Sequence, residues 1–288
     1  MNSALFSVLI ANHNDGKYIE CTLNSILNQT YSNWEVIVVD DASNDNSKDI
    51  YSKYQNDHRF HIFYNESQKG CGYTKRKCVE MANGEICGFV DADDAITSNA
   101  LELMVLKHTE LPNASLIYST YYICDKNLNT VSVSKTQIAL PEGTSFLQYR
   151  SGAISHFATF KKDAYIRTEG MNPNLLLAED MDLYFKLEEV GDLFFIPYAL
   201  YLRRENTGGN VSLGKDNTIK ARIYDLQATA AACQRRGIDY YPLAKKIIED
   251  ITIPYIKDAQ KKIMGTKQYR FGQLILNPFV KIKHLLKS

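Results

Sequence analysis

The chain has 288 residues, and its 33 lysines and arginines balance 33 aspartates and glutamates, so the formal net charge is zero. This length suffices for one large α/β domain, or for one domain with an appendage. The balanced charge argues against a general nucleic-acid binder, and no apolar stretch is long enough to cross a bilayer. The six cysteines form no CxxC pair and no metal-ligand spacing, which favours reduced thiols in the cytoplasm.

The first predicted element is a buried strand, because Phe6 to Ala11 is a continuous apolar run that is too short for a helix. No basic residue precedes this run, so we expect a strand and not a signal peptide. Asn14-Asp15-Gly16 then supplies turn and capping chemistry for a helix. Further strands are predicted over Trp34 to Val39, Arg59 to Tyr64 and Ile86 to Val90, with helices between them. Short connections of this kind imply a parallel sheet with right-handed crossovers.

Polar clusters follow three of these strands: Asn12-His13-Asn14, Asp40-Asp41 and Asp91-Ala92-Asp93-Asp94. Each cluster alone is compatible with a solvated turn, and Asp93 or Asp94 with the cap of the next helix. The carboxyl ends of parallel strands share one edge of a sheet, so we expect the three clusters to form a nucleotide cleft. Clustered carboxylates repel one another unless a cation or a set of donors lies among them. Oxygen ligands suit a hard divalent ion such as Mg²⁺ or Mn²⁺.

A Gly-x-Gly segment, Gly70-Cys71-Gly72, precedes the third predicted helix. Its backbone N–H groups, together with the cationic side chains of Lys75 and Arg76, could approach and bind a phosphate group. The segment lacks the third glycine of the dinucleotide fingerprint and does not follow the first strand, so an NAD fold is set aside. The alternative is an ordinary helix start with solvated cations.

Beyond the fourth strand the pattern predicts a helix over Leu101 to His108 and a tyrosine-rich strand over Ser115 to Cys124. The polar stretch from Asp125 to Glu142 is expected to form a hairpin or a loop. Glu179-Asp180-Met181-Asp182 opens another predicted helix. Acidic residues in a first turn are favoured by the helix dipole, so capping alone explains them. The functional alternative is a general base that takes a proton from an incoming hydroxyl group.

Two adjacent arginines, Arg203 and Arg204, precede the glycine-containing segment Thr207 to Asn210. They suit either a flap that closes over a diphosphate or an ordinary exposed loop. Toward the end of the chain the composition becomes basic, with eight lysines and arginines and one acidic residue after Ile253. Tyr269 to Lys287 interleaves apolar and basic residues, which is typical of helices on anionic membrane surfaces. A helix packed on the domain with a solvated basic rim is the alternative.

Together these motifs resemble the family 2 inverting glycosyltransferases, which have a GT-A fold: a mostly parallel nucleotide-binding α/β sheet flanked by helices. The resemblance covers approximately Phe6 to Ser212. It predicts a GT-A domain over residues 1–212 and a helical, basic, membrane-associating extension over residues 213–288. The segments that carry it are Ser7 to Asn14, Ser25 to Tyr31, Trp34 to Asp41, Gly84 to Asp94 and Glu179 to Leu183.

The resemblance implies a role for each motif. Asp40 or Asp41 binds the base or ribose of a nucleoside diphosphate sugar. Asp91 lies near the ribose and the metal, and Asp93 is the main metal ligand. Asp180, beside Glu179, is the base that deprotonates the acceptor. The other implied nucleotide-sugar contacts are Ala11, His13, Asn14, Gly70, Arg76 and Ala92, whereas Asp94 caps the next helix.

Three departures from the family pattern stand out. His13 replaces a frequent aromatic residue, Arg76 is followed by Lys77 where the family usually has Arg-Asn, and no histidine lies between Tyr201 and Ser212. His156 belongs to the region that would line the acceptor side, or it is a plain structural histidine.

The implied reaction moves a sugar from a nucleoside diphosphate sugar, with a UDP-sugar favoured, to a hydroxyl group of a glycan or lipid-linked glycan. Mn²⁺ or Mg²⁺ would be the cofactor, and cell-surface polysaccharide or lipopolysaccharide synthesis the process. We expect a cytoplasmic protein, peripheral at the inner face of the membrane, with no nucleic-acid partner. A haloacid-type phosphatase would place Asp-x-Asp after the first strand, not the fourth. A catalytically inactive nucleotide-sugar-binding or scaffold protein is the remaining alternative, disfavoured by the presence of Asp91, Asp93 and Asp180 together.

Overall fold

The computed structural model describes residues 4–149, 152–205 and 215–249, together with the isolated helical residues 257, 261 and 264. The chain divides into two compact units, Met1–Ile238 and Asp239–Ser288. In the second unit residues 241–249 form a helix. The predicted domain boundary at residue 212, the segment Thr207 to Asn210 and the basic segment Tyr269 to Lys287 all lie outside the described residues. Within the described part, no helix has the length and apolar character needed to span a membrane.

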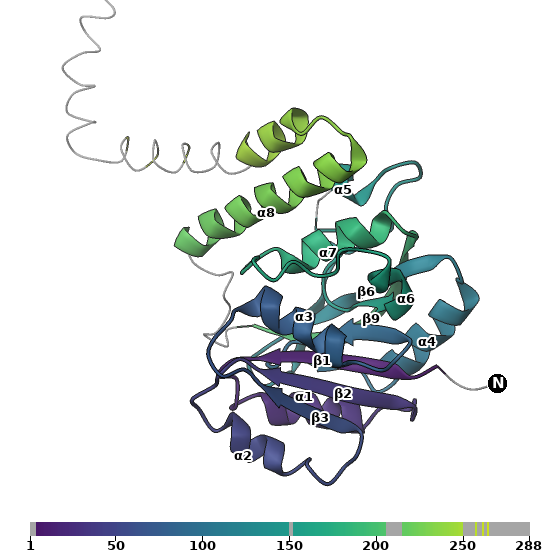
Figure 1. Ribbon diagram of the computed structural model, residues 1–288, viewed down its shortest axis with the longest axis vertical. Coiled ribbons are helices and arrows are strands. Elements are labelled where there is room, and N and C mark those ends of the chain that lie inside the picture. Colours follow the sequence, from purple (N-terminus) through teal and green to yellow (C-terminus); the bar gives the residue numbers. More distant parts are fainter. Residues whose placement is uncertain are drawn as a thin grey trace, which may run out of the picture. The chain divides into compact units, whose positions relative to one another are not determined.

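One mixed sheet runs through the first unit (Figure 1). Among the described residues its order is β3-β2-β1-β4-β8-β6-β9-β5, and β7 pairs with β6. The first four strands in this order are parallel, whereas β8 is antiparallel to both β4 and β6. The strands are β1 (Phe6–Asn12), β2 (Trp34–Asp40), β3 (Phe60–Tyr64), β4 (Ile86–Phe89), β5 (Ala95–Ile96), β6 (Ala114–Cys124), β7 (Thr130–Val133), β8 (Ala158–Lys161) and β9 (Asp192–Arg204).

Helices cover both faces of the sheet, which is why the central strands are apolar on both sides. Phe6, Val8 and Ile10 of β1 share one core with α1, α2 and α4. On the opposite face α3 contacts β1 and β2, while α7 contacts β6 and β9 (Figure 1). Helix α8 packs against α7. The helices are α1 (Ile19–Leu27), α2 (Ser47–Ser52), α3 (Cys71–Met81), α4 (Ala100–Glu110), α5 (Phe146–Tyr149), α6 (Lys162–Ile166), α7 (Glu179–Glu188) and α8 (Lys215–Arg236).

The predicted α/β sheet flanked by helices is confirmed, and so is the hairpin after β6. The alternative of an exposed loop at Arg203 and Arg204 is wrong, whereas the glycine-containing segment that would complete a flap lies outside the described residues. Both residues belong to β9, because this strand pairs along β6 as far as Cys124. The six cysteines are free, as expected.

A candidate catalytic cleft at the carboxyl edge of the sheet

The three predicted polar clusters meet at the carboxyl edge of the parallel strands. Asn12 lies opposite Asp40 in the register of β1 and β2. The N–H of Asp41 donates to the carbonyl of Asn12 at 2.8 Å, and Nδ1 of His13 bonds the carbonyl of Asp41 at 2.8 Å. Since β4 is the other neighbour of β1, the segment that begins at Asp91 joins the same edge. The convergence predicted from strand order is therefore confirmed.

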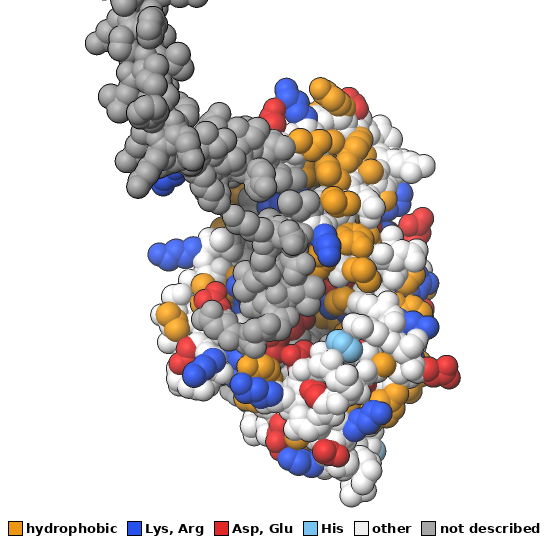
Figure 2. Space-filling view, turned by 90° about the vertical axis from the view of Figure 1, so that its left-hand side faces the viewer, with side chains coloured by type: hydrophobic (Ala, Val, Ile, Leu, Met, Phe, Trp, Pro, Cys, Tyr) orange, Lys and Arg blue, Asp and Glu red, His pale blue; other side chains and the backbone are white. Residues whose placement is uncertain are grey.

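A cavity of about 380 Å³ opens at this edge. Six predicted site residues line it: Ala11, Asp91, Ala92, Asp93, Glu179 and Asp180. The cavity is also lined by residues to which the sequence assigned no site role, or two alternative roles: Asp15, Cys71, Asp94, His156, Arg203 and Arg204. Figure 2 shows acidic side chains gathered in a hollow of this face, next to a histidine. The cleft is thus rich in carboxylates, with cations at its margin.

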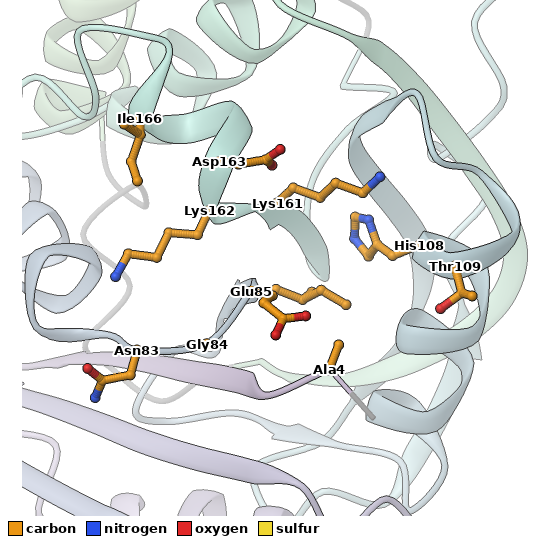
Figure 3. Close-up of a pocket in the computed structure, with 11 residues that line it drawn as sticks. Ala4, Asn83, Gly84, Glu85, His108, Thr109, Lys161, Lys162, Asp163 and Ile166 are labelled. Carbon is orange, nitrogen blue, oxygen red and sulfur yellow. The ribbon is translucent and has the colours of Figure 1, made fainter. Parts of the chain in front are cut away.

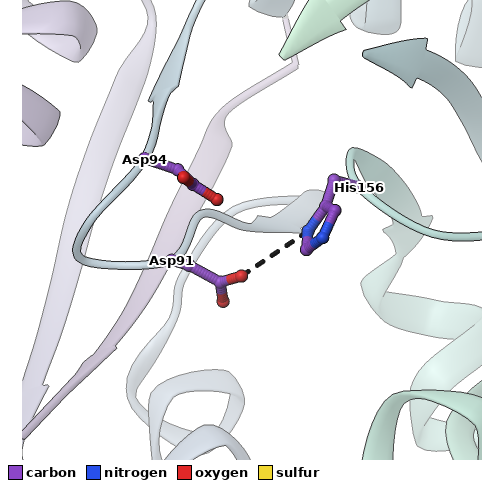
Figure 4. Close-up of side chains that lie close together, drawn as sticks. All are labelled: Asp91, Asp94 and His156. Carbon is purple, nitrogen blue, oxygen red and sulfur yellow. Dashed lines mark ion pairs between the residues drawn. The ribbon is translucent and has the colours of Figure 1, made fainter. Parts of the chain in front are cut away.

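Asp91, Asp94 and His156 form the tightest group of potential metal ligands among the described residues. One ligand atom from each lies within 4.8 Å of the others. Nδ1 of His156 faces Oδ2 of Asp91 at 3.5 Å (Figure 4). Two carboxylates and an imidazole form a donor set that Mn²⁺ accepts. The residues present therefore fit a divalent cation, and Asp93 lines the same cavity.

The predicted capping role of Asp94 is wrong. The residue before α4 is Asn99, and the carboxylate of Asp94 turns instead toward β9. Oδ2 accepts a hydrogen bond from the hydroxyl of Tyr201 at 2.8 Å, and Oδ1 accepts one from the N–H of Arg204 at 2.6 Å. Only 3% of Asp94 is exposed. It is a buried carboxylate held in one orientation at the wall of the cavity.

Three carboxyl groups of the cavity, those of Asp15, Asp94 and Asp180, carry raised pKa values. Burial, followed by the charges of Asp91 and Asp93, raises the pKa of Asp94 to about 8. Burial and the same two charges raise the pKa of Asp15 to about 6. Burial lowers the pKa of His156 despite the opposing effect of Asp91, so its imidazole is neutral and able to act as a ligand. Such shifts cluster at functional sites.

Glu179 and Asp180 occupy the first turn of α7, as the sequence predicts. Oε1 of Glu179 lies 2.7 Å from Nζ of Lys75 and accepts a hydrogen bond from Sγ of Cys71 at 3.2 Å. Burial, followed by the charge of Glu179, raises the pKa of Asp180 to about 6, and Lys75 opposes this rise. Asp180 is therefore a carboxylate whose basicity suits proton transfer near neutral pH.

Asp40 and Asp41 point into the protein. Asp40 is completely buried and accepts hydrogen bonds from the N–H of Ser43 at 2.7 Å and the hydroxyl of Tyr51 at 3.0 Å. Asp41 accepts hydrogen bonds from the N–H groups of Lys69 and Gly70, both at 2.8 Å. Both carboxylates therefore shape the loops around the cleft in this structure.

Gly70 occupies a left-handed backbone conformation, with φ of +92°. This conformation strains any residue with a Cβ atom, which favours glycine here, and the side chain of Leu176 packs over the position where a Cβ atom would lie. Arg76 points elsewhere, toward Glu80 at 2.9 Å and the carbonyl of Met171 at 3.1 Å. His13 and Asn14 contact each other at 3.1 Å in the loop after β1. These four residues and the two inward aspartates are not among the described residues that line the cavity.

A second hollow of about 540 Å³ lies near the amino end of β4 (Figure 3). Of the residues described along its wall, none is a predicted site residue. His108 is buried there, and its Nε2 bonds Oγ1 of Thr159 at 3.0 Å. Burial, followed by the charge of Lys161, lowers the pKa of His108 to about 3. This hollow has none of the acidic clustering of the carboxyl edge.

Sequence reasoning missed Asp15, which lines the cavity, and Tyr201, which hydrogen-bonds Asp94 and Asp91 at its wall. Asp15 directly follows the first polar cluster, and that position was the available signal. Tyr201 belongs to no motif, so only the path of β9 brings it to the cluster.

Residues 7–169 match the family model described as Glycosyl transferase family 2. A chondroitin synthase of Escherichia coli is 29% identical over 226 residues, which are 75% of this chain and 32% of that protein. The matched part of the chain spans between 22% and 49% of the length of the curated relatives compared here.

Solved structures share the fold. One is TarS 1–349 of S. aureus in complex with UDP-GlcNAc, with a TM-score of 0.65 and 20% identity; the match covers 85% of this chain and 71% of that chain. Another is the mannosyltransferase PcManGT of Pyrobaculum calidifontis in complex with GDP-Man and Mn²⁺. Its TM-score is 0.60 at 14% identity, over 98% of this chain and 87% of that chain.

Proposed function

Because this chain belongs to glycosyltransferase family 2, we propose that it is an inverting transferase that moves a sugar from a nucleoside diphosphate sugar to a hydroxyl group of a glycan. One observation carries the proposal: a single cavity holds both Asp180, a carboxylate with basicity near neutral pH, and the group Asp91, Asp94 and His156. A base for the acceptor and a site for a cation near the leaving group are what this reaction needs.

Asp180 takes the proton of the acceptor hydroxyl as its oxygen attacks the anomeric carbon. The new glycosidic bond forms on one face of the sugar while the bond to the diphosphate breaks on the other, so the carbon inverts. Glu179 does not compete for this proton, because its charge is paired with Lys75 at 2.7 Å. A divalent ion, Mn²⁺ or Mg²⁺, would neutralise the departing diphosphate when bound by Asp91, Asp94 and His156, with Asp93 at the same cavity.

A UDP-sugar is the proposed donor, supported by the fold shared with the UDP-GlcNAc complex of TarS. The donor would lie against Ala11, Asp91 and Ala92 in the cavity. Its base would extend toward His13, in the loop after β1 and outside the cavity lining. Asp41 would support donor binding indirectly. Its carboxylate accepts hydrogen bonds from the N–H groups of Lys69 and Gly70 and so fixes the turn at Gly70. The similar chondroitin synthase supports a polysaccharide as acceptor. A lipid-linked glycan is supported by a glucosyltransferase of Escherichia coli that is named for GlcNAc-diphosphoundecaprenol and is 33% identical over 44% of this chain. A peripheral position at the inner membrane face rests on the basic segment near the end of the sequence.

A panel of nucleotide sugars tests the proposal. UDP-GlcNAc, UDP-glucose, UDP-glucuronic acid and GDP-mannose are each added with Mn²⁺ or Mg²⁺, and thermal shift and nucleotide release are measured. At least one donor should raise the melting temperature and release nucleotide. The Asp180→Asn protein is the matched control, because it should bind the same donor without transfer. If no donor stabilises the wild-type protein, the proposal is wrong, and stabilisation without any release would indicate an inactive binding protein.

A further inference from the structure

Tyr201 of β9 touches all three residues of the group Asp91, Asp94 and His156. Its hydroxyl donates a hydrogen bond to Oδ2 of Asp94 at 2.8 Å and accepts one from the N–H of Asp91 at 3.1 Å. Its ring stacks on His156 with centroids 5.1 Å apart and an angle of 14° between the planes. We propose that Tyr201 is a positioning residue that holds this group in the geometry that binds a divalent cation.

The hydroxyl of Tyr201 has a fixed direction. Tyr201 is 1% exposed, so its hydroxyl bonds protein groups. Its single O–H points at Asp94, because the N–H of Asp91 already donates to the phenol oxygen. Each carboxylate oxygen of Asp94 therefore accepts one hydrogen bond from the protein: Oδ2 from the hydroxyl of Tyr201, and Oδ1 from the N–H of Arg204. A carboxylate oxygen accepts at two positions, so each keeps one for a cation.

The ring of Tyr201 restricts His156 in a second way. His156 stacks on Tyr201, and its ring also packs nearly perpendicular to that of Tyr121, with centroids 5.4 Å apart and an angle of 85°. Tyr121 and Tyr201 are partners in the register of β6 and β9. The imidazole is therefore oriented by two aromatic side chains on adjacent strands, with Nδ1 toward Asp91. Partners that orient metal ligands in this way commonly contribute tenfold or more to metal affinity.

The substitution Tyr201→Phe distinguishes the contribution of the hydroxyl group from that of the aromatic ring. It keeps the stack on His156 and removes both hydrogen bonds. Tyr118→Phe is the matched control: Tyr118 is equally buried, lies on β6, and donates its hydroxyl to the carbonyl of Ile138 at 2.7 Å. Binding of Mn²⁺ alone to the full chain, without donor or acceptor, is measured by the electron paramagnetic resonance signal of free Mn²⁺. We expect the Kd of Tyr201→Phe to rise about 10- to 100-fold, and that of Tyr118→Phe to stay near the wild-type value.

A double-mutant cycle tests whether Tyr201 acts through Asp94. Asp94→Asn should weaken Mn²⁺ binding, and adding Tyr201→Phe to it should cause little further loss, because the hydroxyl has lost its charged partner. Fully additive losses would overturn the proposed route. A Tyr201→Phe protein that binds Mn²⁺ like the wild type would overturn the inference itself.

Folding is checked by circular dichroism and by melting in increasing Mn²⁺, which gives a Kd even for a destabilised variant. If Tyr201→Phe stays unfolded in excess Mn²⁺ while Tyr118→Phe folds, Tyr201 serves the fold and the inference is refuted. The inference rests on the cation site of the proposed function, but the two fail differently. A wild-type protein that binds no Mn²⁺ contradicts the proposed site, whereas equal binding by wild type and Tyr201→Phe contradicts only the positioning role.

Discussion

The buried ion pair between Lys75 and Glu179 makes a strong prediction about stability. Nζ and Oε1 are 2.7 Å apart, and the two side chains are only 13% and 8% exposed. Lys75→Met leaves the charge of Glu179 buried without its partner, which should reduce the free energy of unfolding by about 3 to 5 kcal/mol. Lys53→Met is the matched control. Its ion pair with Glu20 has the same 2.7 Å distance but is 53% and 43% exposed, so the loss should be roughly 0 to 1 kcal/mol.

Urea titration followed by circular dichroism measures both losses. The double variant Lys75→Met/Glu179→Gln should recover most of the stability, because no unpaired charge is then buried. Since Lys75 also lowers the pKa of Asp180, Lys75→Met should move the acid limb of the kcat profile to higher pH. Equal losses in Lys75→Met and Lys53→Met would refute the reasoning, because burial is the feature that distinguishes the two pairs.

Three further predictions concern catalysis, pH and the membrane. Asp180→Asn should lower kcat by roughly 10² to 10⁴-fold with donor affinity unchanged, and wild-type kcat should fall as pH drops below the Asp180 pKa of about 6; a flat profile would contradict the base assignment. The pKa of His108 is about 3 in the folded protein and 6.5 in its ordinary state, so the unfolded chain takes up the proton first as pH falls below 6.5. The free energy of unfolding should therefore decrease by about 2 kcal/mol from pH 8 to pH 5, and His108→Gln should weaken this dependence in urea titrations at the two pH values. Deleting Tyr269 to Ser288 should release the protein from anionic liposomes at moderate salt in a flotation assay, and unchanged flotation would refute the membrane proposal.

Local patterns were enough to predict the first half of the fold. The predicted strands that became β1, β2 and β4 are apolar runs, and as inner strands of the parallel part of the sheet they are almost wholly buried. The edge strand β3 is only partly buried. β8 carries no such signal. It has four residues, Ala158–Lys161, and becomes a strand because it fits between β4 and β6. β9 likewise depends on its long pairing with β6, which is why Arg203 and Arg204 looked like a loop.

The sequence by itself determined that acidic motifs would meet at one edge of a parallel sheet, because strand direction and right-handed crossovers leave no other arrangement. It therefore placed Asp91 and Asp93 at the same edge as Asp40 and Asp41, whereas Asp180 was assigned to the cleft only through the resemblance to the family. Only the tertiary structure decided how the carboxylates are used. Asp94 became a buried acceptor because its donors, Tyr201 and the N–H of Arg204, come from β9, 107 and 110 residues later in the chain. Asp40 points inward because the packing of α2 brings the hydroxyl of Tyr51 to it. Hydrogen-bond partners brought in by distant strands and helices have no local pattern, so they are invisible until the chain is folded.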